Sequence, residues 1–157
     1  MDTPLKSRPG PGPTPTLEAR HRTAILGSVT LPGRAEEVSG ARSFITRTLA
    51  AAGKGHLVDS DAATLLTSEL VTNAILHTAS GAGDGSVTVV VVDVPDGVLI
   101  EVIDDGSAGT PVVKGDLFAA DGHGLYLVQQ LAAQWGYLRD PAGTTVWFHL
   151  AAHHGDG

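Results

Sequence analysis

Two short runs rich in valine, residues 87–94 and 98–104, constrain the fold of this chain more than any other feature. Each has the length and the β-branched composition of a strand, and only Pro95-Asp96-Gly97 separates them. So short a connection joins neighbouring strands in a hairpin, because parallel strands need a crossover of about a dozen residues or more. The sequence therefore predicts a sheet that contains this antiparallel hairpin.

Apolar residues recur at helical spacing on both sides of the hairpin. Helices are expected over residues 35–52, 60–78 and 122–135. Gly53 ends the first, because glycine adopts the left-handed conformation that closes many helices. Asp59 or Ser60 can cap the second by accepting a hydrogen bond from a backbone amide.

Further strands are expected over residues 23–31, 137–139 and 144–150, and residues 105–121 are expected to form a mobile loop. The resulting order, β-α-α-β-β-loop-α-β-β, does not alternate as parallel βαβ units do. The chain is therefore expected to adopt an α+β fold. Its architecture would be a two-layer α/β sandwich, with the helices on one face of a mostly antiparallel sheet.

With 157 residues, of which 42% are hydrophobic, the chain can bury the core of one domain, expected over residues 17–152. Residues 1–16 are rich in proline and glycine and contain no apolar stretch. They are therefore expected to be a disordered tail rather than a signal peptide. Residues 153–157 are expected to form a second, shorter disordered tail.

The net charge of −7 argues against non-specific nucleic-acid binding, which depends on cationic side chains at phosphates. The chain has no cysteine, which excludes disulfides and thiolate metal sites. Its most apolar run, residues 87–94, is too short to cross a bilayer. The sequence therefore predicts a soluble, cytoplasmic protein without a membrane or direct nucleic-acid partner.

Polar residues interrupt the apolar face of the second helix. Glu69, Asn73 and His77 are four residues apart, so they share one face, each turned a little further around the axis. The apolar residues expected in the same sector are Ala62, Leu65, Leu66, Leu70 and Leu76. Burying such polar groups without partners costs roughly a few kcal/mol each. We therefore interpret this face of the helix as the floor of a binding site for a polar ligand. The alternative is that Glu69 and Asn73 lie on a face exposed to solvent.

These side chains suit a metal-dependent reaction. The Asn73 amide oxygen can bind Mg²⁺, a hard cation that proteins hold through one or two oxygens together with water and substrate phosphates. Glu69, one turn earlier, can take a proton from a hydroxyl group or from water. His77 is expected to be a packing or hydrogen-bonding partner at the edge of the pocket.

Three motifs that contain glycine follow along the chain. In Asp104-Asp105-Gly106, a carboxylate at a strand end can accept a hydrogen bond from a purine amine, and the glycine lets a flat ring approach the backbone. Gly122-His123-Gly124-Leu125 opens the third helix, where glycine amides can bind an anion. Gly143-Thr144-Thr145 precedes the last strand. Taken singly, each motif is also explained as an ordinary turn or helix start.

Together and in this order, ELVTNAILH, DDG, GHGL and GTT resemble the nucleotide-binding boxes of the GHKL, or Bergerat-fold, ATPases over about residues 20–150. The resemblance implies ATP and Mg²⁺ as cofactors, with Asn73 binding the metal and Glu69 acting as catalytic base. It implies that Asp104 holds the adenine amine beside Gly106, and that residues 105–121 are the ATP lid. The expected nucleotide-binding set also includes Gly122 and Gly124 at the phosphates, Thr145 near the base, and His77, Lys114, His123 and Leu125.

Within that superfamily the chain is similar to the small bacterial anti-sigma-factor serine/threonine kinases. The lid expected over residues 105–121 is short, and neither a phosphoacceptor helix pair nor a transducer domain is expected within these 157 residues. This resemblance implies a kinase that binds a sigma factor, phosphorylates a serine on an antagonist protein and regulates transcription by partner switching. Members of the group are commonly dimers, which implies a homodimer here. Arg42 matches the point on the first helix where the group contacts its partners.

One departure from that group concerns phosphate binding. An arginine often precedes or separates the glycines of the GxG box, where this chain has Ala120, Asp121 and His123. Lys114, from the lid, is the expected substitute. Two alternatives to a kinase follow, namely a nucleotide-dependent partner-binding module without kinase activity and a simple ATP hydrolase.

Overall fold

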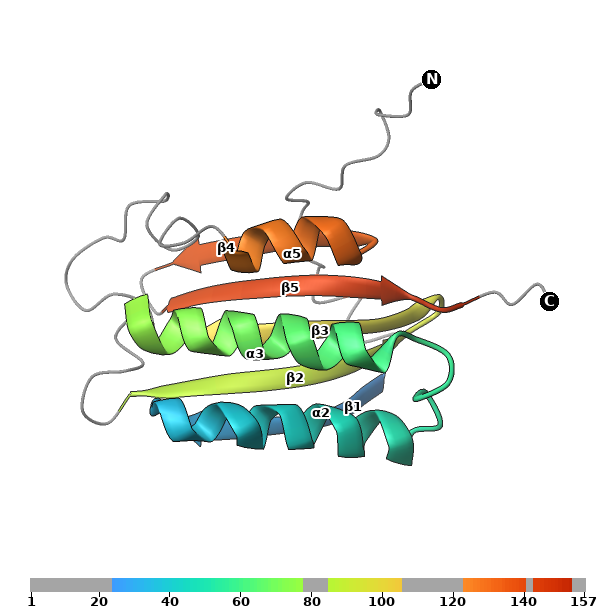
Figure 1. The fold of residues 1–157 in the computed structure, drawn as a ribbon, viewed down its shortest axis with the longest axis horizontal. Helices are drawn as coiled ribbons and strands as arrows, with labels where there is room; N and C mark the ends of the chain where they lie inside the picture. The colour runs from blue at the N-terminus through green and yellow to red at the C-terminus, as the bar shows by residue number, and fades with distance from the viewer. Residues whose placement is uncertain (1–23, 78–84, 106–122, 141–142, 154–157) are drawn as a thin grey trace, which may run out of the picture.

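The computed structural model describes residues 24–77, 85–105, 123–140 and 143–153. In chain order its elements are β1 (Ala24–Pro32), the short 3-10 helix η1 (Ala35–Glu37), α2 (Val38–Ala51), α3 (Ser60–His77), β2 (Ser86–Val94), β3 (Gly97–Asp104), α5 (His123–Leu131), β4 (Gln134–Asp140) and β5 (Gly143–Ala151). The described strands form one sheet in the order β1-β2-β3-β5-β4, and each neighbouring pair is antiparallel. Helices α2, α3 and α5 lie on one face of this sheet (Figure 1). The expected two-layer α+β architecture is confirmed.

The valine-rich hairpin forms the middle of the sheet. Val94 pairs with Gly97, and the register continues to Val87 opposite Asp104. Gly97 is required at the turn, because its φ is +128° and a Cβ there would press on the Leu150 carbonyl. β3 then lies between β2 and β5, so it is the central strand.

Alternate residues of the strands face the helices and build the core. The fully buried strand residues on that face include Val87, Val89, Val91, Val98, Ile100 and Phe148. Helices α2 and α3 cover them with Ala41, Ile45, Leu49, Leu66 and Val71. A second group of buried residues, Val90, Val92, Leu99 and Trp147, belongs to the intervening positions and so lies on the opposite face of the sheet.

The connection between α2 and α3 is fixed at both helix ends. Gly53 has a φ of +72°, and the amide of Lys54 donates to the Leu49 carbonyl, as in a Schellman motif. At the start of α3, Asp59 Oδ1 accepts a hydrogen bond from the Ala62 amide at 3.0 Å. Asp59 is therefore the N-cap, one of the two residues that the sequence offers for that role.

The expectation that the third helix reaches Trp135 is wrong. α5 ends at Leu131, and the Ala133 amide already donates to the His149 carbonyl of β5. Trp135 and Tyr137 then share one face of β4, with their rings stacked at a centroid distance of 6.5 Å. Because Trp135 is only 2% exposed, burial of this ring in the core favours the strand over a further helical turn.

Several expected segments lie outside the described residues, namely residues 1–16, most of the loop over residues 105–121, and residues 154–157. His153, which the sequence places in the C-terminal tail, is described, and its amide donates to the Leu57 carbonyl at 2.6 Å. Within the described part of the chain, no helix has the length and apolar character needed to span a membrane.

Candidate functional site

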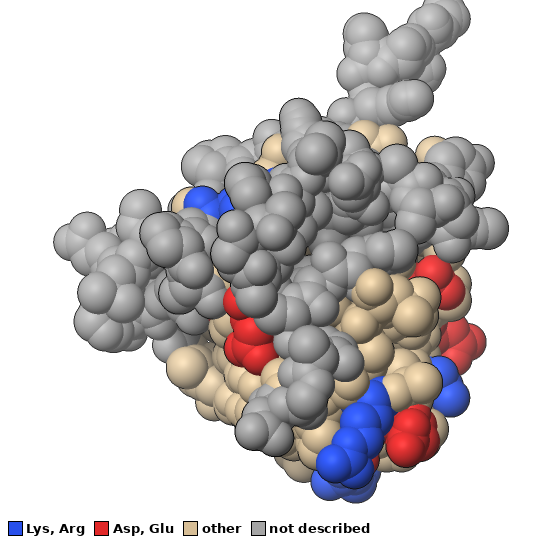
Figure 2. All heavy atoms as spheres, turned by 90° about the vertical axis from the view of Figure 1, so that its left-hand side faces the viewer, with Lys and Arg blue, Asp and Glu red and all other residues tan. Residues whose placement is uncertain are grey.

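The segments that carry the sequence motifs meet at one end of the sheet. The C-terminal end of α3, the end of β3, the start of α5 and the start of β5 all lie at the left of Figure 1. Figure 2 looks onto this end, where acidic and basic side chains both reach the surface. The antiparallel fold therefore assembles one surface from parts of the chain that are far apart in sequence.

Glu69 and Asn73 lie at the border between the buried and the exposed sides of α3. Both side chains are half-buried. Beside them, Leu66 and Leu70 are buried against the core. A carboxylate and an amide at such a border can meet a ligand from solvent while their aliphatic parts remain packed.

Two of the apolar residues expected beside Glu69 and Asn73 face outward, so that part of the expectation is wrong. Leu65 and Leu76 are 40% and 66% exposed, whereas Ala62 is buried with Leu66 and Leu70. Four residues along an α-helix turn a side chain by about 40°, and three residues turn it back by about 60°. Leu65 therefore lies one step outward of Glu69, and Leu76 lies outward of Asn73.

Asp104, the last residue of β3, is 6% exposed on the face that carries the helices. Its Oδ1 accepts a hydrogen bond from the Thr144 backbone amide at 3.1 Å, and this bond is buried. Asp105 is exposed, and its Oδ2 accepts a hydrogen bond from the Ser86 amide at 2.8 Å. The two adjacent carboxylates therefore differ in role, because Asp105 links β3 to β2 while Asp104 faces the helix layer.

Thr144, rather than Thr145, lies beside Asp104. The register pairs Asp104 with Thr144 and Ile103 with Thr145, and paired residues share a face of the sheet. Thr144 is 4% exposed on the helix side, so Thr145 faces the opposite side. The expectation that Thr145 lies near the ligand does not fit this register. Val146, Phe148 and Leu150 alternate along β5 with Thr145, Trp147 and His149, so counting back by twos from Phe148 puts Thr144 on the more apolar face, a signal in the sequence that could have identified it.

The GHGL motif is described only in part. α5 begins at His123, so its N-terminal end lies at the same end of the sheet as Asp104 (Figure 1). Gly124 lies within this helix. Other expected site residues are not described: Gly106, Lys114 and Gly122 lie outside the described residues, as do the side chains of His77, His123 and Leu125.

The described residues contain no group of three or more His, Asp or Glu side chains that could hold a metal ion. Asn73 supplies a single amide oxygen from a half-buried position. Mg²⁺ bound through one or two protein oxygens takes its other ligands from water and phosphate. The donor set therefore fits a metal that arrives with a phosphate-bearing ligand.

The site offers different chemistry at its two ends. The buried Asp104 carboxylate can accept a hydrogen bond from an amine, because a carboxylate has about four lone-pair sites. On α3, Glu69 carries a carboxylate that can accept a proton and Asn73 an amide oxygen that can bind a cation, and the N-terminus of α5 favours negative charge. Such a surface suits a ligand with an amine at one end and phosphates at the other.

A model of the family described as histidine kinase-like ATPase domain matches residues 31–150. The match runs from the end of β1 to the penultimate residue of β5, and it includes Glu69, Asn73, Asp104 and Thr144. A comparison with the curated proteins finds no match.

Proposed function

The chain belongs to the family of histidine kinase-like ATPase domains, and from this premise we propose that it is an ATP-dependent serine/threonine protein kinase of the anti-sigma-factor type. Membership makes it an ATP-binding module of the GHKL type. In the proposed role it binds a sigma factor, phosphorylates a serine of an antagonist protein and regulates transcription by partner switching.

The buried and oriented Asp104 carboxylate carries this proposal. Its bond to the Thr144 amide fixes the carboxylate at the end of the central strand. The exocyclic amine of adenine donates a hydrogen bond where a carboxylate accepts one. Guanine presents a carbonyl oxygen at the same ring position, and two acceptors repel. Asp104 can therefore select ATP over GTP.

The phosphate end of the site accounts for the transfer step. Asn73 would hold Mg²⁺ through its amide oxygen, and the bound ion would neutralise charge on the phosphates. The serine oxygen forms a bond to the γ-phosphorus while the bond from that phosphorus to ADP breaks. Glu69, one turn before Asn73 and half-buried, accepts the proton that the serine loses.

The partner surface is proposed on α2. Arg42 and Arg47 are both exposed on this helix, about 140° apart around its axis, so each presents a cationic group to solvent where a protein partner can contact it. Arg42 is the residue proposed to make the contact. The protein is proposed to act as a homodimer, in keeping with the group of kinases that it resembles.

Replacement of the Glu69 carboxylate tests the assigned reaction. Glu69→Ala in the full chain is expected to reduce phosphate transfer from labelled ATP to an array of serine peptides by about 100-fold or more. Its affinity for ATP, measured by calorimetry with Mg²⁺, is expected to stay within about threefold, because the carboxylate acts on the acceptor. Asp61→Asn is the matched control, since Asp61 is an exposed carboxylate at the start of the same helix.

The outcomes separate the proposal from its rivals. Transfer that persists in Glu69→Ala would remove Glu69 as the base. A partner-binding module without kinase activity is the second candidate, favoured by Ala120, Asp121 and His123 where related kinases often have arginine. Such a module would bind ATP and transfer phosphate to neither peptide nor water. Slow phosphate release to water alone would indicate an ATP hydrolase.

A further inference from the structure

The first residue of β5 lies against the backbone that carries Asp104. A Cβ atom on Gly143 would lie much closer than 3.0 Å to the Asp104 carbonyl oxygen. Cβ atoms essentially never come within 3.0 Å of such an atom. A Cβ on Gly143 would also crowd the backbone of Asp105. Because the crowded atoms are backbone, no side-chain rotation relieves the contact. Gly143 therefore permits an approach of β5 to β3 that any other residue would prevent.

The same stretch of backbone is held from its other side by β2. Asp105 Oδ2 accepts the Ser86 amide hydrogen bond at 2.8 Å, and Ser86 directly precedes the β2 residue that pairs with Asp104. The Asp104–Asp105 peptide is thus fixed between β5 and β2. From this fixed backbone the Asp104 side chain receives the Thr144 amide bond.

We propose that Gly143 and Asp105 are positioning residues, which hold the Asp104 carboxylate where it distinguishes adenine from guanine. Hydrogen-bond strength falls steeply as distance and angle depart from their optimum. A displacement of the Asp104 backbone by a few tenths of an ångström therefore weakens both the Thr144 bond and the bond to the purine. The inference rests on the ATP site proposed above, and neither positioning residue touches the ligand.

The other end of β3 supplies a matched control. Gly97 has a positive φ of +128°, and a Cβ there would press on the Leu150 carbonyl as closely as one on Gly143 presses on Asp104. The eight residues of β3 separate the two ends by roughly 23 Å. Gly97→Ala therefore imposes a similar local clash far from Asp104.

The experiment compares Mg·ATP and Mg·GTP affinities by calorimetry on the full chain. Gly143→Ala is expected to weaken ATP binding about tenfold and to bring the ATP-to-GTP affinity ratio close to that of Asp104→Ala. Gly97→Ala is expected to lower the melting temperature but to leave the affinity ratio of the wild type. Asp105 is exposed, so Asp105→Ala is expected to fold normally. Its ATP-to-GTP affinity ratio is expected to fall, but by less than in Gly143→Ala. In Asp105→Asn the side-chain oxygen still accepts the hydrogen bond from the Ser86 amide, so this variant is expected to restore the ATP-to-GTP affinity ratio of the wild type.

Two results would overturn the inference. One is an ATP-to-GTP affinity ratio that stays at the wild-type value in both Gly143→Ala and Asp105→Ala. The other is a fall of this ratio in Gly97→Ala as large as that in Gly143→Ala. Failure of the proposed ATP site is distinguishable, because the wild type would then bind neither nucleotide. In that case, hydrogen exchange of the Thr144 amide in the free protein decides whether the positioning contacts exist. Faster exchange in Asp105→Ala and Gly143→Ala, but not in Gly97→Ala, would support them, and equal exchange in all three would refute them.

Discussion

Trp135 has the greatest volume of the fully buried side chains in the described residues, and its ring stacks on Tyr137. Truncating it leaves a cavity that the rigid core refills only partly. Trp135→Ala is therefore expected to lower the free energy of unfolding by about 3–5 kcal/mol in urea denaturation. Leu138→Ala, on the same strand at a position 48% exposed, is expected to change it by less than about 0.5 kcal/mol. Equal losses in the two variants would contradict the assignment of Trp135 to the core.

At the same scale, the sequence indicates some site residues and leaves others undecided. Glu69 and Asn73 could be singled out, because helical spacing puts polar groups beside buried leucines, and the structure finds both half-buried. The choice between Thr144 and Thr145 depends on register, since a shift of one residue turns a side chain to the other face of the sheet. The alternation of Val146, Phe148 and Leu150 along β5 favours the register in which Thr144 faces the core. Its place beside Asp104 is set by pairing with β3, which no local pattern encodes.

At the scale of the element, the turn after α2 depends on one glycine. Gly53 has a φ of +72°, and an added Cβ would meet nothing within 4 Å, so alanine there would suffer backbone strain but no collision. Gly53→Ala is expected to cost about 1 kcal/mol of stability. Gly55→Ala, also in open space and without a positive φ, is expected to leave stability unchanged or to raise it by about 0.4–1 kcal/mol. Thermal unfolding of the two variants gives the comparison, and a cost at Gly55 equal to that at Gly53 would refute the role of the left-handed turn.

The boundaries of elements were predictable where a local signal marks them. Asp59 caps α3 and Gly53 closes the turn after α2, and both signals stand in the sequence. The end of α5 has no such mark, because apolar residues continue at helical spacing up to Trp135. The chain enters β4 through contacts with distant residues, namely the bond from the Ala133 amide to the His149 carbonyl, the pairing of β4 with β5 and the burial of Trp135 in the core.

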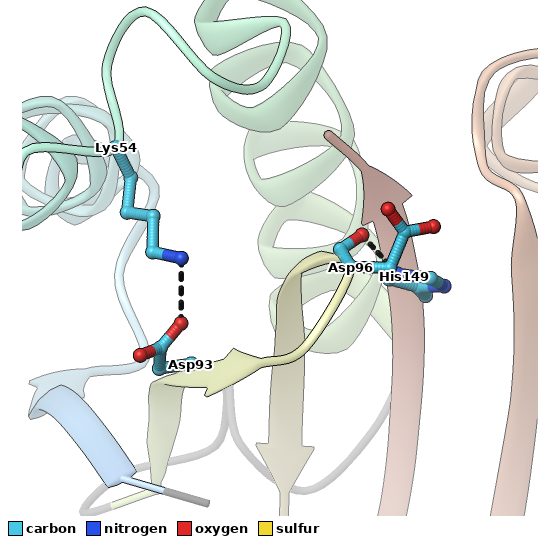
Figure 3. Close-up of polar contacts among 4 residues, drawn as sticks. All are labelled: Lys54, Asp93, Asp96 and His149. Atoms are coloured by element: carbon cyan, nitrogen blue, oxygen red, sulfur yellow. Dashed lines mark hydrogen bonds and ion pairs between the residues drawn. The ribbon is translucent and has the colours of Figure 1, made fainter. Parts of the chain in front are cut away.

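At the scale of the whole molecule, the end opposite the candidate site holds a separate set of polar contacts. Lys54 Nζ lies 2.7 Å from Asp93 Oδ1, and His149 Nε2 donates to the Asp96 carbonyl at 2.9 Å (Figure 3). Asp93 is 38% exposed, so water weakens the ion pair. Lys54→Met is expected to cost less than about 1 kcal/mol, to cost still less at high salt, and to leave ATP affinity unchanged. Urea denaturation and calorimetry check both parts, and a change in ATP affinity would show that the two ends are coupled.

The strand order of the whole sheet could not be predicted from the sequence. The valine-rich hairpin and the absence of βαβ alternation predicted antiparallel pairing, and every pair in the sheet is antiparallel. They did not determine that β5 lies between β3 and β4, because the chain leaves β3 and returns by way of α5 and β4 before β5 forms. Long-range pairing of this kind is fixed by the packed core rather than by local composition.

The bond between the Thr144 amide and Asp104 joins residues 40 positions apart, so a nucleotide site built on it exists only while this end of the sheet is folded. Mass action then links occupancy to global unfolding, and free ligand at 100 times its dissociation constant adds about 2.7 kcal/mol to the free energy of unfolding. Unfolded chains are the ones that proteases degrade. The lifetime of this protein would therefore follow the nucleotide supply, independently of any phosphate that it transfers.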